Sequence, residues 1–99
     1  MIQTWKYYDE SYIVDTERPE SYHDLVRSLL DFNDCYDELV EYMEDEVGNG
    51  ADVLIRMIWE GPEHVADSLV HGFVEWLMDD MGRLTELVET NCILTEGGE

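Results

Sequence analysis

Apolar and aromatic residues flank a polar triplet at the start of the chain. Residues 1–15 hold two apolar clusters, and Asp9, Glu10 and Ser11 lie between them. β-Branched and aromatic residues on either side of a polar turn are typical of a β-hairpin. A lone hairpin is marginal in water, so this one must pack on the rest of the chain. We predict a hairpin over residues 1–15.

From residue 21 to residue 91 apolar residues recur at spacings of three and four, the repeat of an amphipathic helix. One repeat begins at Ser21, a residue type that caps helix N-termini. Another begins after Asn33 and ends at Gly48, a natural C-cap. Residues 51–59 are apolar on almost every side, so we expect the most buried helix there.

A Gly61-Pro62 pair interrupts the pattern, and Pro62 suits the first position of the next helix. The apolar spacing then continues through Gly82, either as one long helix or as two. Residues 92–95 could add a short strand to the hairpin, and residues 96–99 are expected to fray. The predicted core consists of Leu25, Leu29, Leu39, Met43, Leu54, Ile55, Ile58, Leu69, Phe73, Trp76, Leu77 and Leu84.

The length of 99 residues suits one domain over residues 1–99, and 44% hydrophobic content argues against disorder. We predict an α+β fold that is mainly α: a bundle of four or five helices with a small N-terminal β-hairpin. No apolar run approaches the roughly 18 residues of a membrane span. The first residues lack a basic and apolar leader, and Cys35 and Cys92 fit a reducing cytoplasm or at most one bridge. We therefore expect a cytoplasmic protein.

Charge is the most informative property of the composition. The chain has 25 Asp and Glu against 5 Lys and Arg, which gives a formal net charge of −20. Such an excess repels nucleic acid and anionic membranes, so neither is expected as a direct partner. Solubility needs a net charge of only about 2–8, and self-repulsion destabilises the compact state. The excess therefore indicates a function beyond solubility.

Nine acidic residues and no Lys or Arg lie between Arg27 and Arg56. Within this stretch, acids spaced by three and four residues predict a continuous stripe on a helix opposite its apolar face. Like-charge neighbours such as Asp34–Glu38 and Glu41–Asp45 would each cost about 0.2–0.5 kcal/mol. The predicted partner-binding residues are Asp34, Asp37, Glu38, Glu41, Glu44, Asp45 and Glu46, with Asp79 and Asp80 as a second cluster.

Little in the sequence points to catalysis. There is no glycine-rich phosphate loop and no Cys-x-x-Cys pair, and among 25 carboxylates no acid–base pair can be singled out. Glu60 and His64 are four residues apart, as are Asp67 and His71, so each pair would share a helix face. Such a site would be open, unlike structural zinc. We predict no catalytic residue, no metal and no cofactor, and therefore not an enzyme.

Carboxylates one helical turn apart lie about 5.4 Å apart, comparable with the phosphate spacing of about 3.4 Å along one DNA strand. In size, charge, helical patterning and dispersed acids such as Asp34 to Glu46, the chain resembles the small acidic DNA-mimic proteins of bacteriophages and mobile elements. That class includes the Ocr anti-restriction protein and several anti-CRISPR proteins. The resemblance implies an inhibitor that blocks the basic groove of a DNA- or RNA-binding protein in the host cytoplasm, often as a homodimer.

Two other interpretations stay open. An acidic, lysine-poor surface also suits a small protein adapted to high salt, although three Trp and six Tyr fit that idea less well. The chain could also be an acidic protein-interaction adaptor without mimicry.

Overall fold

The predicted N-terminal hairpin is present in the computed structural model, which describes residues 1–79 and 81–97. Strand β1 (Ile2–Tyr7) pairs antiparallel with β2 (Glu10–Asp15) through a two-residue turn. Strand β3 (Ile93–Glu96) pairs antiparallel with the other side of β1, so the order of the sheet is β2–β1–β3. The C-terminal strand suggested by the sequence therefore completes the sheet.

The described end of the chain is more ordered than we predicted. Glu96 lies in β3 instead of fraying. Gly97 follows with a φ of 78°, and its Cα lies so close to the main chain of Ile2 that a Cβ has no room. Glycine is suited to both requirements. Residues 98–99 of the predicted frayed tail lie outside the described residues.

Helices dominate the described residues, as predicted. They comprise one 3₁₀ turn and five α-helices: η1 (Pro19–Tyr22), α1 (His23–Asp31), α2 (Tyr36–Glu46), α3 (Ala51–Glu60), α4 (Glu63–Asp79) and α5 (Met81–Asn91). Together with the sheet they form the α+β, mainly α fold expected from the sequence.

Helix ends follow the predicted signals in part. Ser21 does not cap a helix, because its Oγ bonds to the main chain of Asp15 and of Arg18 and it lies inside η1. At the end of α1, Asn33 adopts a left-handed φ of 65°, a conformation that asparagine tolerates better than most residues. Helix α2 ends at Glu46 with Val47 as its C-cap, and Gly48, the predicted C-cap, follows directly with a left-handed φ of 73°.

The long apolar repeat after Pro62 forms two helices. Pro62 directly precedes α4 instead of occupying its first position, and its carbonyl accepts the Ala66 N–H at 3.1 Å. Helix α4 ends at Asp79 and α5 begins at Met81, so Gly82 lies within α5 and does not separate the two helices.

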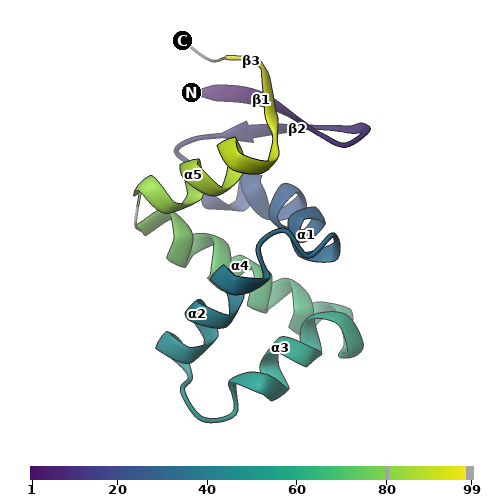
Figure 1. Cartoon of the computed structure of the whole chain (residues 1–99), viewed down its shortest axis with the longest axis vertical. Helices are drawn as coiled ribbons and strands as arrows, with labels where there is room; N and C mark the ends of the chain where they lie inside the picture. The colour runs from purple at the N-terminus through teal and green to yellow at the C-terminus, as the bar shows by residue number, and fades with distance from the viewer. Residues whose placement is uncertain (80, 98–99) are drawn as a thin grey trace.

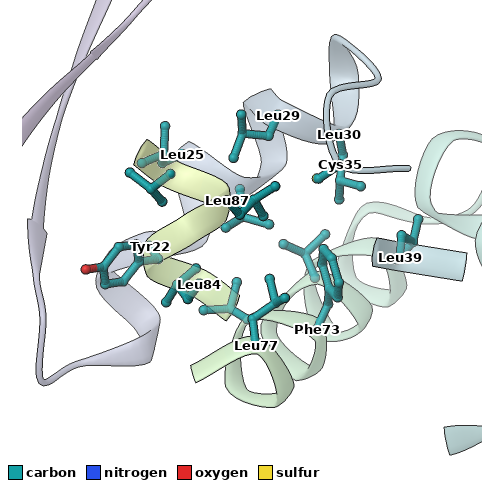
Figure 2. Packing of buried hydrophobic residues seen from close by; sticks show 14 of the residues in the cluster. Tyr22, Leu25, Leu29, Leu30, Cys35, Leu39, Phe73, Leu77, Leu84 and Leu87 are labelled. Carbon is teal, nitrogen blue, oxygen red and sulfur yellow. The ribbon is translucent and has the colours of Figure 1, made fainter. Parts of the chain in front are cut away.

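The core forms around α4, which packs against α1, α2, α3 and α5 (Figure 1). Figure 2 shows side chains of these helices, including Leu25, Phe73 and Leu87, converging in one cluster. Most of the predicted core residues are buried. Leu54, Leu69 and Trp76 are only half-buried at its edge. The sheet adds Trp5, Tyr7 and Val14, which the helix-based prediction omitted.

The prediction that α3 is the most buried helix is wrong. Only Ala51, Ile55 and Ile58 are buried there, whereas Val53 is 59% exposed and Trp59 is 41% exposed. The physical reason is the position of α3 at one end of the molecule. It packs against α2 and α4 through one side, and the figure shows no layer on its other side (Figure 1).

The molecule measures 42 × 26 × 21 Å. The sheet lies at one end of the longest axis, and α2 and α3 lie at the other end (Figure 1). No helix in the described ranges is long and apolar enough to cross a membrane.

Candidate functional site

Helix α2 presents its carboxylates to solvent, as the sequence predicts. Leu39 and Met43 bury one face of the helix, and most of the acids lie on the remaining surface. Asp34 is an exception in one respect, because it belongs to the loop before α2. Asp34 and Glu38 are therefore not an intrahelical like-charge pair, whereas Asp37–Glu41 and Glu41–Asp45 are such pairs.

Two adjoining grooves run along this side of the molecule. The first, of about 400 Å³, lies between α2 and α5, and its lining includes Asp34, Glu38 and Glu86. The second, of about 380 Å³, brings Asp45 of α2 together with Asp79 of α4. Both grooves share Glu41 and Arg83 as lining residues. The fold thus joins Asp79 to the predicted α2 site, while Asp80 lies outside the described residues.

The α2 stripe has a cation, contrary to the sequence prediction. Arg83 of α5 donates from Nη2 to Glu41 Oε1 at 2.6 Å. The Arg83 guanidinium also lies over the Trp76 ring, 4.6 Å from its centroid. An arginine 42 residues away along the chain was not visible in the local charge pattern.

Two more of the predicted acids accept hydrogen bonds from aromatic residues. Tyr7 donates its hydroxyl to Asp34 Oδ2 at 2.5 Å. Trp76 donates its indole N–H to Asp45 Oδ2 at 3.3 Å. These contacts fix part of the acidic stripe against the rest of the fold.

The other acids of α2 have no such partner. Within residues 1–79 and 81–97, no hydrogen bond or ion pair involves the side chains of Asp37, Glu38, Glu44 or Glu46. Asp37, Glu44 and Glu46 are exposed, and Glu38 is half-buried in the first groove. These four carboxylates are therefore the uncompensated part of the site.

Sequence reasoning missed Glu75 and Glu86, which come from other helices. Glu86 lines the first groove from α5. Glu75 of α4 and Glu46 of α2 both act on Tyr42: burial raises the pKa of that phenol most, and the charges of Glu46 and Glu75 raise it further. Only the packing of α4 and α5 against α2 brings these acids to one side. We call the whole set the acidic surface: Asp34, Asp37, Glu38, Glu41, Glu44, Asp45, Glu46, Glu75, Asp79 and Glu86.

The two cysteines are free and buried. Burial raises the pKa of the Cys35 thiol, and the charges of Glu38 and Asp34 raise it further. Burial likewise raises the pKa of Cys92, with Asp34 contributing, to about 11. Both thiols therefore stay protonated at neutral pH, which is unfavourable for a nucleophile.

One of the two histidine–carboxylate pairs shares a helix face as the sequence suggested: Asp67 and His71 both lie in α4 and line one pocket. Glu60 ends α3 and His64 lies in α4, so the two are not on one helix. His71 Nε2 lies 3.3 Å from Glu75 Oε1, while Asp67 faces His23 of α1 at 3.5 Å. No group of three or more metal-ligating side chains occurs among the described residues.

Comparisons of the chain with protein-family models, with curated proteins and with solved structures found no match.

Proposed function

We propose that this protein is a nucleic-acid mimic that blocks the basic groove of a DNA- or RNA-binding protein, such as a restriction enzyme or a CRISPR effector. It acts by binding and not by catalysis, in the cytoplasm of the cell that contains its target. The carboxylates of the acidic surface occupy positions that phosphates otherwise fill. Nucleic acid and this protein then compete for one groove.

One observation carries the proposal: the four carboxylates of α2 that have neither an ion pair nor a hydrogen bond within the described residues. Arg83 pairs with Glu41, but within residues 1–79 and 81–97 no cation pairs with Asp37, Glu38, Glu44 or Glu46. Glu44 and Glu46 lie in the last turn of α2, where the helix dipole disfavours negative charge. A surface that keeps this cost without a bonded partner among the described residues is suited to a cationic partner.

The dimensions support the same interpretation. Successive turns of α2 place its carboxylates about 5.4 Å apart along the axis, and Glu75, Asp79 and Glu86 add acids from two further helices. Carboxylates along one helix with further acids beside them form an anionic surface, and a basic groove meets such a surface on nucleic acid. A homodimer, which remains part of the proposal, would lengthen this pattern.

Affinity capture from a bacterial lysate on the immobilised protein tests the proposal. We expect the bait to retain a nuclease or another nucleic-acid-binding protein, and duplex DNA or RNA in the wash to release it. Raising the salt concentration should weaken retention, because exposed charges are screened. Captured protein that resists both competitor and salt would contradict mimicry. Retention of a metabolic enzyme would favour the adaptor interpretation instead.

The matched bait is the triple variant Asp37→Lys, Glu44→Lys and Glu46→Lys. All three residues are exposed and have no bonded partner among the described residues, so the fold should tolerate the changes. Glu41 is left intact because a lysine there would face Arg83. The triple variant should retain none of the nucleic-acid-binding protein. Folding of the wild type only in molar salt would favour the high-salt interpretation.

A further inference from the structure

A cluster of aromatic rings lies at the tip of the hairpin. Tyr8 of the turn and Phe32 after α1 have ring centroids 4.6 Å apart with an interplanar angle of 32°. Tyr7 meets both rings edge-on, at 4.7 Å and 5.7 Å. Tyr7 is buried, but Tyr8 is 61% exposed and Phe32 is 57% exposed. We call these three residues the aromatic platform.

The backbone holds the platform in an unusual way. Tyr8 has a left-handed φ of 55°. Asn33, which directly follows Phe32, also has a left-handed φ, of 65°. A bulky residue rarely adopts this conformation, and glycine or asparagine is the usual choice in such a turn. The result is that two large rings meet in solvent where small polar residues would suffice.

One carboxylate contacts the platform, and a second is adjacent to it in the chain. Tyr7 donates its hydroxyl to Asp34 Oδ2, and Oδ1 of this exposed residue has no partner among the described residues. Asp9 follows Tyr8 in the turn and is exposed, and it has no ion pair within those residues. The faces of aromatic rings are also electron-rich. The platform therefore favours a flat cation that can stack on a ring and bond to a carboxylate.

The same chemistry already occurs inside this chain. The Arg83 guanidinium lies 4.6 Å from the centroid of the Trp76 ring and bonds to Glu41 at 2.6 Å. Arginine suits this arrangement better than lysine, because its planar fork stacks on rings and binds a carboxylate in a bidentate manner. The platform offers rings and a carboxylate, and no cation among the described residues lies over its rings.

We propose that the aromatic platform, with Asp34 beside it, binds an arginine side chain of the partner protein. This inference deepens the proposed function, on which it rests for the identity of the partner. Asp34 also lines the groove between α2 and α5, so the platform is continuous with the acidic surface. An arginine bound there would fix the partner at one end of that surface.

Titrations with an arginine hexapeptide and a lysine hexapeptide, followed by NMR and calorimetry, test the inference. We expect the arginine peptide to bind about two- to fivefold more tightly, the range for a cation–π contact at an exposed site. The aromatic signals of Tyr8 and Phe32 should shift with the arginine peptide. Because the probes are peptides, the titrations measure arginine binding separately from competition with nucleic acid. The inference can therefore fail while the mimic proposal holds, and the mimic proposal can fail while the inference holds.

Two variants make the test specific. The double variant Tyr8→Asn and Phe32→Leu removes both exposed rings, and asparagine tolerates the left-handed turn. It should bind the two peptides equally. The control Tyr36→Leu removes another exposed ring, which contacts Trp59, and should keep the preference for arginine. Equal affinity of the wild type for both peptides, or shifts centred on Tyr36 and Trp59, would overturn the inference.

Discussion

Carboxylates at the α1–α4 interface differ from those on the surface of α2 in their ion pairing. At the interface, Asp67 lies 3.5 Å from His23 and 4.0 Å from Arg27. Arg27 also lies 3.8 Å from Asp31 and donates to the Ile58 carbonyl at 3.1 Å. On α2, four of the acids have no partner of this kind within the described residues. The contrast follows the placement of the few cations.

The difference shows which acids the fold uses. Where helices pack, a carboxylate meets an arginine or a histidine, and the pair contributes to a junction between elements. Where α2 faces solvent, most of its carboxylates have no hydrogen bond or ion pair within the described residues. Substitutions at the packed regions should therefore affect stability, and substitutions on α2 should affect binding. Substitutions in both regions test this separation.

Phe73→Ala should cause the largest loss of stability, about 3–5 kcal/mol. Phe73 is fully buried in α4, and its ring lies 5.5 Å from that of Tyr42 on α2. Chemical denaturation measures the free energy of unfolding. The half-buried Leu54 is the control, and Leu54→Ala should cost distinctly less because fewer contacts are lost. Equal losses would show that the burial assigned to α3 and α4 is wrong.

Tyr7→Phe should cost about 1.5–3 kcal/mol at neutral pH, because it removes a hydrogen bond to a charged acceptor, Asp34. It should also alter alkaline unfolding. Burial, then the hydrogen bond and charge of Asp34, raise the pKa of Tyr7 above its ordinary value of 10.0. The folded state therefore holds this proton longer, and stability falls as the pH rises above about 10. Denaturation midpoints measured across alkaline pH should fall less steeply in Tyr7→Phe than in the wild type.

Arg27→Gln should cost about 1–2 kcal/mol, because Arg27 bonds to a main-chain carbonyl of α3 and faces two carboxylates. The thermal midpoint of this variant should fall even at high salt, since the Ile58 bond is partly buried. A midpoint that matches the wild type would mean that Arg27 does not stabilise the α1–α4 interface. The proposed difference between the paired acids there and the unpaired acids of α2 would then be wrong.

The triple variant of α2, Asp37→Lys, Glu44→Lys and Glu46→Lys, should change stability by no more than about 0.5 kcal/mol. Repulsion among acids falls, and Glu44→Lys and Glu46→Lys place cations in the last turn, where the helix dipole favours them. Asp37→Lys removes a favourable acid from the first turn, so the effects largely cancel. Salt should also raise its melting temperature less than that of the wild type, because there is less repulsion to screen. A large destabilisation would show that these carboxylates have a structural role after all.

Features of the fold and of the site that depend on local residue spacing could be predicted from the sequence. The hairpin, the left-handed glycine just after α2 and the exposed acids of α2 follow from patterns within a few residues. Contacts between distant segments could not be predicted that way. The pairing of Glu41 with Arg83 and the meeting of Tyr8 with Phe32 depend on how whole elements pack.

The failure at α3 has a related cause. Its apolar sequence predicts burial on every side, but burial also needs a second layer, and the end of the molecule provides only one. Glu75 and Glu86 were missed because neither lies in an acidic run of the sequence. Their place beside α2 is a property of tertiary packing.

The most direct test of mimicry compares two triple variants with equal charge changes for their affinity toward the captured partner. One is the α2 variant, and the other is Asp52→Lys, Glu60→Lys and Glu63→Lys, at exposed positions of α3 and α4. The account predicts that the α2 variant loses binding by about a hundredfold or more, the equivalent of roughly three charge pairs. The other variant should lose less than about fivefold. Equal losses in both would mean that net charge, and not the surface of α2, determines binding, and would contradict the account.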